Sequence, residues 1–309
     1  MGRRFRRRLK HTLAYLAVLG VRFLLEHLPR HIALRLGERG GRWAYRALRM
    51  ARRRTQEHIR MALGLRGPEL RRLSERVFQE LGRNLAEFLR LRALLREGLE
   101  GVVRTEGLGN LDRALAEGRG VVVITGHLGN WEILGAYLAR RGYPLWAVGR
   151  RLFDRRIDGL VVEHREMAGV HNIPRGEDAR ALVRILRGGG VLGLLMDQDT
   201  EVQGVFAPFF GRPAYTPAGP VKLAMRTGAP IVPMALYRER EGYRLVVLPS
   251  VSLPDTGDRE ADLREGVARC NRVLEALVRM HPEQWVWMHR RWRTKPERYS
   301  LEMRCAGGR

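Results

Sequence analysis

The sequence predicts an α/β protein whose central sheet is mainly parallel and flanked by helices, with an N-terminal helical extension that associates with a membrane. Three observations support this prediction. From about residue 100 onward, short apolar runs alternate with longer helical patterns, as in parallel α/β sheets. The preceding residues show helical spacing only, and the chain opens on a basic cluster followed by an apolar run. We therefore expect a basic, amphipathic, membrane-associating helix over residues 1–28, a helical region over 29–99 and an α/β domain over 100–309.

The N-terminal basic cluster consists of Arg3, Arg4, Arg6, Arg7, Arg8 and Lys10. An apolar run from Leu13 to Leu25 follows it and is interrupted by Arg22. Because a membrane-spanning helix needs roughly 20 mostly apolar residues, this run predicts an amphipathic helix on an anionic cytoplasmic leaflet. A signal peptide fits less well, since no small-residue cleavage pattern follows. A single tilted span remains an alternative, at the cost of placing Arg22 near its centre.

Three helices are expected in the next region, over Arg30–Leu48, Thr55–Ala62 and Pro68–Leu95. The last has the clearest pattern, because its apolar residues recur at helical spacing while arginines fill the gaps. Such a stripe is typical of a helix that packs on a protein core. Gly98 and Gly101 mark the change to the pattern that follows.

The alternating part of the chain predicts six strands and six helices. The strands are expected at Val102–Thr105, Val121–Thr125, Leu145–Val148, Val191–Met196, Ile231–Leu236 and Arg244–Leu248. The helices are expected at Leu111–Glu117, Trp131–Arg140, Asp154–Met167, Ala179–Arg187, Pro220–Thr227 and Glu260–Met280. Because helices separate most of the strands, the sheet should be mainly parallel with helices on both faces.

Composition narrows the classes of partner. The formal net charge is +24, and nearly all of the positive charge comes from arginine. Such a surface attracts anions, whether nucleic acid, anionic lipid or an acidic carrier protein. Only two cysteines, Cys270 and Cys305, are present, which is too few for a disulfide framework or a zinc site and favours a reducing compartment.

Several common site patterns are absent from the sequence. It contains no phosphate-binding glycine loop ending in Lys and Ser or Thr, no dinucleotide-binding glycine fingerprint after the first strand and no Gly-x-Ser-x-Gly elbow. Its histidines have no helical metalloprotease spacing, so no metal site is expected. No recognisable nucleic-acid-binding module accompanies the positive charge, and nucleic acid is therefore not an expected partner.

The segment Gly126–Glu132 carries the clearest chemical signal. His127 follows a β-branched run that predicts a buried strand, and parallel sheets place reactive groups beyond the carboxyl ends of their strands. If Asn130 caps the next helix, Glu132 lies in its first turn and can fold back toward the imidazole. The pair would then act as a general base held in one tautomer. The alternative is that His127 only satisfies backbone groups at the strand end.

Several segments together resemble the lysophospholipid acyltransferase superfamily, and within it the lipid A late acyltransferase branch. The first box has the superfamily's His-x4-Glu pattern. The segments that carry the resemblance are Gly126–Glu132, Arg150 and Arg165, Asp197-Gln198-Asp199, Phe206–Gly211 with Thr216 and Pro217, and Pro282–Arg291. The likeness extends from about Thr55 to Pro296 and keeps the order of the boxes.

The resemblance implies a direct acyl transfer. His127 would deprotonate a hydroxyl of the acceptor lipid, Glu132 would orient the imidazole, and the alkoxide would attack a thioester of acyl carrier protein or coenzyme A. The tetrahedral oxyanion needs hydrogen-bond donors. Arg165 is the first candidate, with a structural ion pair as its alternative role, and the backbone N–H groups near Gly129 and Asn130 are the second.

Other positions in the boxes receive weaker assignments. Arg150 is expected to bind a phosphate or carboxylate, or simply to be solvated. Asp197 and Asp199 are expected to position Arg165 or the acceptor sugar rather than a metal. Gly211 is expected to meet a requirement for positive φ. The C-terminal tryptophans are expected to pack in the core with a basic rim, with contact to the membrane interface as the alternative.

The sequence thus predicts a membrane-associated O-acyltransferase that esterifies a lipid A precursor at the cytoplasmic face of a bacterial inner membrane. It would be peripheral or held by a single N-terminal anchor, and it would need no cofactor beyond acyl-carrier-protein or acyl-CoA as co-substrate. Its partners would be that donor, anionic membrane lipid and the glycolipid acceptor. A phosphatidylinositol mannoside is the alternative acceptor. A non-catalytic lipid-binding or carrier-docking protein is the alternative from another class.

Overall fold

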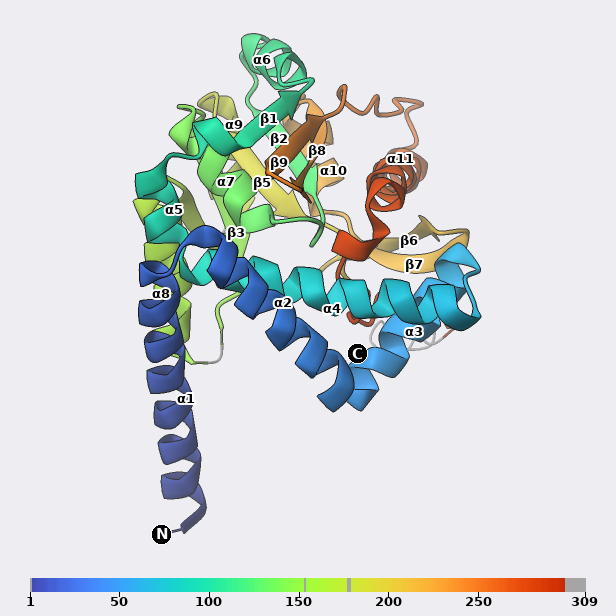
Figure 1. The fold of residues 1–309 in the computed structure, drawn as a ribbon. Helices are drawn as coiled ribbons and strands as arrows, with labels where there is room; N and C mark the ends of the chain where they lie inside the picture. The colour runs from blue at the N-terminus through green and yellow to red at the C-terminus, as the bar shows by residue number, and fades with distance from the viewer. Residues whose placement is uncertain (1, 153, 177–178, 298–309) are drawn as a thin grey trace.

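The computed structural model describes residues 2–152, 154–176 and 179–297 (Figure 1). Five helices precede the sheet: α1 (Gly2–His27), α2 (Arg30–Ala47), α3 (Arg49–Leu63), α4 (Gly67–Leu89) and α5 (Leu91–Glu97). The strands are β1 (Val103–Glu106), β2 (Val121–Thr125), β3 (Leu145–Gly149), β4 (His171–Pro174), β5 (Val191–Leu195), β6 (Gly204–Phe209), β7 (Arg212–Pro217), β8 (Ile231–Glu239) and β9 (Gly242–Val247). The remaining helices are α6 (Gly109–Ala116), α7 (Trp131–Arg140), α8 (Arg155–Met167), α9 (Ala179–Arg187), α10 (Gly219–Thr227) and α11 (Arg259–Met280).

The central sheet has seven strands in the order β1-β9-β8-β2-β5-β3-β4. Pairing is parallel from β8 through β2, β5 and β3 to β4. The β8–β9 hairpin is antiparallel, and β1 runs parallel to β9. A mostly parallel sheet flanked by helices is therefore confirmed. β6 and β7 form a separate antiparallel ribbon.

Helices cover both faces of the sheet because its central strands are apolar on both sides. Along β2, Val122 and Ile124 join a core with side chains of α3, α4, α9, α10 and α11. Val121 and Val123 join the opposite core, with side chains of α5, α6 and α7. A strand buried on both faces reads as a continuous apolar run rather than an alternation, which is why this element was visible in the sequence.

All six predicted strands are present, with ends that differ by up to a few residues. Three further strands were not predicted. β4 is a short edge strand without a β-branched run. In the ribbon of β6 and β7, Pro208 is paired with Pro213. Proline is disfavoured inside sheets, and a two-stranded ribbon tolerates it because both of its strands are edges.

The predicted helices before the sheet need two corrections. α3 begins at Arg49 rather than Thr55, and the helix predicted over Pro68–Leu95 is divided between α4 and α5 at Arg90. Arg90 is only 2% exposed, and its guanidinium donates to the carbonyl oxygens of Leu25 and Leu28 and to the Glu97 carboxylate. These contacts hold the end of α1 against the break. The sequence pattern gave no sign of this inward-turned charge.

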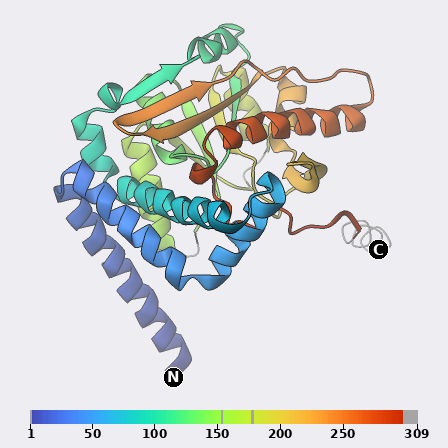
Figure 2. The same cartoon turned by 45° about the vertical axis from the view of Figure 1, so that its right-hand side comes forward.

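α1 extends away from the rest of the molecule at its N-terminal end, as both views show (Figures 1 and 2). Leu13, Leu16 and Phe23 on this helix are exposed. Arg22, expected to interrupt the apolar run at the membrane, is instead buried and pairs with Glu26 and with Glu163 of α8. The side chains of the basic cluster, from Arg3 to Lys10, lie outside the described side chains. Within the described part of the chain, no helix combines the length and apolarity needed to cross a membrane.

Candidate active site

His127 lies just beyond the carboxyl end of β2, where parallel sheets present reactive groups. Two backbone hydrogen bonds hold its loop to the C-terminal segment. The N–H of Val286 donates to the His127 carbonyl oxygen, and the N–H of Gly129 donates to that of Gln284. Gly129 has a φ of 58°, and a Cβ there would stand 1.8 Å from the Leu236 carbonyl oxygen. The loop therefore requires glycine at this position.

Asp197, at the end of β5, holds the His127 ring. The distance from His127 Nδ1 to Asp197 Oδ1 is 2.9 Å, and the backbone N–H of His127 donates to Asp197 Oδ2 at 2.8 Å. The indole Nε1–H of Trp285 donates to the same Oδ2 at 2.8 Å. Gly126 makes room for this carboxylate, since a Cβ at that position would lie 3.0 Å from Asp197 Cγ.

Asp197 is a buried but charged partner. Burial by itself would raise its pKa, but the charge and hydrogen bonds of His127, together with the Trp285 indole, lower the pKa of Asp197 to about 2. An ionised carboxylate at Nδ1 favours the tautomer with its proton on Nδ1, which leaves Nε2 free to accept one. The His127 side chain is 26% exposed, so the ring is not sealed inside the protein.

The sequence predicts that Glu132 orients the imidazole of His127. In the structure Glu132 binds Arg165 instead. Arg165 Nε lies 2.9 Å from Glu132 Oε2, and Nη2 lies 2.6 Å from Oε1. Nη1 donates to Asn172 Oδ1 at 3.3 Å. The first turn of α7 carries Glu132 toward α8, and the adjacent pairing of β2 and β5 brings Asp197 to the imidazole instead.

The Arg165–Glu132 pair lies over the end of β3. A Cβ at Gly149 would be 2.8 Å from Arg165 Nη1, so glycine leaves space for the guanidinium. Burial by itself would lower the pKa of Arg165, but the hydrogen bonds and charge of Glu132 raise it above its ordinary value. Of the two roles considered for Arg165, the structure shows the ion pair. Three of its five N–H groups are engaged in these contacts.

The second set of predicted oxyanion donors is already engaged. The Gly129 N–H donates to the Gln284 carbonyl oxygen at 2.9 Å, and the Asn130 N–H donates to the Leu236 carbonyl oxygen at 3.0 Å. These backbone groups fix the loop to its neighbours and do not form an open oxyanion site. Asn130 is confirmed as the cap of α7, since its side-chain oxygen accepts from the Ile133 N–H.

A buried ionic cluster beneath the His127 loop was missed in the sequence. Glu87 of α4 is completely buried and pairs with Arg238 at 2.6 Å and with Arg30 at 2.9 Å. Arg238 also donates to Asn84 Oδ1, and Asn84 Nδ2 donates to the Gly129 carbonyl oxygen at 2.6 Å. Burial opposes the charge on Glu87, but the two arginines lower its pKa. The only sequence signal was a set of polar residues on the apolar stripe of α4.

The remaining predicted residues have separate roles. Asp199 accepts from the Thr294 N–H and hydroxyl and from Arg293, so it holds the C-terminal segment rather than Arg165 or a sugar. Gly211 has a φ of 68°, as expected. Arg150 is exposed after β3. Among the described residues, no group of three or more His, Cys, Asp or Glu side chains is arranged to hold a metal ion.

The C-terminal signature packs in the core. Trp285, Trp287 and Trp292 are 2%, 0% and 7% exposed, respectively. Trp285 and Trp287 meet edge to face, with ring centroids 4.6 Å apart, and Phe209 lies against Trp285. This aromatic cluster supports the indole that binds Asp197, so the C-terminal box is connected to the His127 site by direct contacts.

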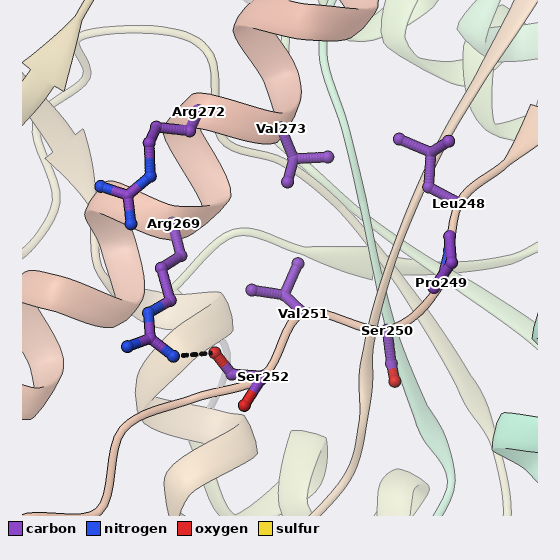
Figure 3. Close-up of a pocket in the computed structure, with 8 residues that line it drawn as sticks. All are labelled: Leu248, Pro249, Ser250, Val251, Ser252, Arg269, Arg272 and Val273. Carbon is purple, nitrogen blue, oxygen red and sulfur yellow. Dashed lines mark hydrogen bonds between the residues drawn. The ribbon is translucent and has the colours of Figure 1, made fainter.

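Two cavities lie outside this site. One, of about 380 Å³, lies between the segment after β9 and α11, where Arg269 donates to the Ser252 carbonyl oxygen (Figure 3). The other, of about 770 Å³, is lined by residues of α3, the start of α4 and Arg212. Neither cavity is lined by His127, Asp197 or Glu132.

Comparison with known proteins places this site in a family. Among the relatives that match along nearly the whole chain are two from Escherichia coli. The lipid A biosynthesis lauroyltransferase is 27% identical over 93% of this chain and 94% of its own, and the palmitoleoyltransferase is 28% identical over 90% of each. The phosphatidylinositol mannoside acyltransferase of Mycobacterium tuberculosis is 32% identical over 60% of this chain, and the match spans only 58% of that relative's length.

The family model for bacterial lipid A biosynthesis acyltransferases matches residues 3–294. This range runs from the second residue of α1 through α11 and includes the His127 loop, Asp197 and the C-terminal tryptophans. The chain therefore belongs to the bacterial lipid A biosynthesis acyltransferase family.

Proposed function

We propose that the protein is a membrane-associated O-acyltransferase that moves a fatty acyl group from a thioester to a hydroxyl of a glycolipid. The observation that carries this proposal is the hydrogen bond between His127 Nδ1 and the buried Asp197 carboxylate, 2.9 Å long, in the loop with the family's His-x4-Glu pattern. In this arrangement His127 would act as a general base through Nε2, the ring nitrogen that does not bind Asp197.

The reaction would proceed without a covalent enzyme intermediate. Nε2 of His127 takes the proton of the acceptor hydroxyl, and the oxygen attacks the thioester carbonyl. The new C–O bond forms, the C–S bond breaks, and the imidazolium returns the proton to the leaving thiolate. Asp197 stabilises the imidazolium, as a buried carboxylate does in a catalytic triad.

Arg165 would stabilise the oxyanion formed during the attack. Glu132 accepts from two N–H groups of the guanidinium and Asn172 from a third, which leaves two N–H groups for the developing charge. In this proposal Glu132 is a positioning residue that acts through Arg165. This replaces its predicted role as the residue that orients the imidazole.

The proposed donor is an acyl carrier protein or coenzyme A thioester, and the proposed acceptor is a lipid A precursor. The relatives that match along nearly the whole chain are named for lipid A biosynthesis. A phosphatidylinositol mannoside is the second candidate, because the mycobacterial relatives are named for acylation of that lipid. Mass spectrometry of lipids from cells with and without the gene would identify both the acceptor and the added chain.

Acyl transfer by purified protein tests the chemistry. Wild type should transfer acyl groups from a thioester, and His127→Ala should lose activity by about 10²–10⁴-fold, the usual contribution of general base catalysis. Equal rates in the two proteins would contradict the role of His127. Lipid or carrier binding by wild type with no transfer from either donor would instead support the non-catalytic alternative.

A further inference from the structure

Arg150 and Arg175 lie at the carboxyl ends of the neighbouring strands β3 and β4. Gly149 and Pro174 are paired in register at the ends of β3 and β4, and Arg150 and Arg175 are the next residues in each strand's direction. The N–H of Arg175 donates to the Gly149 carbonyl oxygen at 2.8 Å, which continues the pairing past the strand ends. In the sheet order β2-β5-β3-β4, these arginines lie on the same edge as His127 and Asp197.

The Arg175 side chain reaches across the end of β3 toward the catalytic pair. Its Nη2 donates to the hydroxyl of Thr200 at 2.6 Å. Thr200 lies in the loop after β5, next to Asp199 and three residues after Asp197. Arg165 lies over the same strand end, against Gly149. Arg165 and Arg175 are therefore both placed at the end of β3, and Arg150 directly follows that strand.

The partners of these arginines differ. Arg165 is neutralised by Glu132, whereas Arg175 is held by a neutral hydroxyl. Partial burial and the charge of Arg150 lower the pKa of Arg175, while Glu201 acts in the opposite direction. Within the described part of the chain, neither Arg150 nor Arg175 forms an ion pair. The fold thus keeps two like charges close enough to act on each other, at an electrostatic cost that a bound anion would reduce.

We propose that Arg150 and Arg175 form a phosphate-binding subsite beside the His127 site. A phosphate offers several oxygens to planar guanidinium groups, which bind it through paired N–H donors. This inference rests on the proposed function for its substrate, since the phosphate could belong to the pantetheine arm of the thioester donor or to the glycolipid acceptor. The residues involved are separate from the base, its carboxylate and the Glu132–Arg165 pair.

Direct binding tests the subsite without any acyl transfer. Inorganic pyrophosphate is titrated into wild type, Arg150→Gln, Arg175→Gln and the double variant by calorimetry at low salt. The double variant should bind at least tenfold more weakly than wild type. Arg184→Gln, which removes an exposed arginine of α9 and the same charge, should bind like wild type. Equal binding by wild type and the double variant, or no binding by wild type, would overturn the proposal.

Folding and kinetics complete the experiment. Arg150 is exposed, so that Arg150→Gln should keep the wild-type Tm, and its own loss of pyrophosphate affinity tests the subsite even if Arg175→Gln folds poorly. A higher KM for the donor in the arginine variants would assign the phosphate to the thioester, and a higher KM for the acceptor would assign it to the glycolipid. Unchanged KM values for both substrates would contradict a substrate subsite.

The same variants separate this inference from the proposed function. His127→Ala should lose acyl transfer and keep pyrophosphate binding, because His127 is not part of the subsite. A second outcome is that wild type shows no acyl transfer but binds pyrophosphate, with binding lost in the Arg150→Gln/Arg175→Gln variant. That result would refute the proposed function and support the anion site.

Discussion

The role of His127 depends on a carboxylate that lies 70 residues away in the sequence. Glu132 is much nearer along the chain, but its two oxygens bind Arg165. The two acids therefore act at different points of the proposed reaction, one on the base and one on the oxyanion. Substitutions that remove only charge can separate these roles.

Asp197→Asn should lower kcat by about 10²–10⁴-fold, because the amide no longer stabilises the imidazolium and can hold the wrong tautomer. Glu132→Gln should lower kcat by about 10–10³-fold by loosening Arg165. Acyl-transfer rates at saturating substrate measure both effects. Glu166→Gln, an exposed position on α8, is the matched control. Wild-type kcat in Asp197→Asn would contradict the assignment of this carboxylate.

The lowered pKa of Asp197 predicts how the stability of the protein changes in acid. Its pKa is lowered from an ordinary value of 3.8 to about 2. The folded state therefore holds the ionised form more favourably, and this stabilisation is present above about pH 4 and lost as the pH falls toward 2. The loss should amount to about 2 kcal/mol. Urea unfolding at pH 5 and pH 3 should show a smaller decline in Asp197→Asn than in wild type. The same decline in both proteins would count against this carboxylate as a source of acid sensitivity.

At the scale of elements, α2 and α4 approach so closely that their contact requires glycine. A Cβ at Gly41 would stand 2.1 Å from the Phe78 carbonyl oxygen, and one at Gly82 would stand 2.0 Å from that of Gly37. Arg30 of α2 then reaches Glu87 of α4, and Asn84 of α4 binds the Gly129 carbonyl oxygen. The packing of two helices thereby supports the loop that carries His127.

Two neighbouring glycines of α2 provide a matched test of this contact. Gly41→Ala should destabilise the protein by about 1–3 kcal/mol, because backbone atoms must move to admit the methyl group. A Cβ at Gly40 would meet nothing within 4 Å. Gly40→Ala should therefore stabilise the protein by about 1 kcal/mol, because alanine has the higher helix propensity. Chemical denaturation measures both values. Equal effects of the two substitutions would mean that the close approach does not limit stability.

At the scale of the molecule, several strongly exposed apolar side chains belong to α1 and to the residues on either side of the turn between α2 and α3. Leu16 and Phe23 of α1 are 55% and 67% exposed, and Trp43 and Met50, on either side of the turn between α2 and α3, are 69% and 74% exposed. In both views α1 extends toward the side on which α2 meets α3, away from α6 (Figures 1 and 2). These exposed apolar side chains, on a protein with a net charge of +24, are suited to binding the surface of an anionic bilayer.

Vesicle binding tests this membrane association. Wild type should sediment with vesicles containing anionic lipid more than with zwitterionic vesicles, and less at high salt. Leu16→Glu with Trp43→Glu should reduce binding strongly, whereas Ala116→Glu on α6 should not. Substitution is a sharper test than deleting residues 1–28, because Leu25 is buried against the body of the protein. If the double variant bound vesicles as well as wild type, the side chains of Leu16 and Trp43 would not form the membrane contact.

The sequence by itself determined the features that depend on near neighbours along the chain. The apolar run of β2, the turn at His127 and the Asn130 cap follow from local periodicity and backbone preferences. The helix break at Arg90 and the β6–β7 ribbon could not be predicted in this way. The buried charge of Arg90 and the pairing of Pro208 with Pro213 depend on partners that are distant in the sequence or on the pairing of two strands.

Only the tertiary structure decided which side chains meet. Sheet order placed β5 beside β2 and so gave His127 the carboxylate of Asp197, while α8 brought Arg165 to Glu132. The buried Glu87–Arg238 pair and the reach of Arg175 to Thr200 arise in the same way. The physical reason is that a carboxylate pairs with whichever cation or ring the fold brings within hydrogen-bond distance, and that distance is set by strand and helix packing rather than by spacing along the chain.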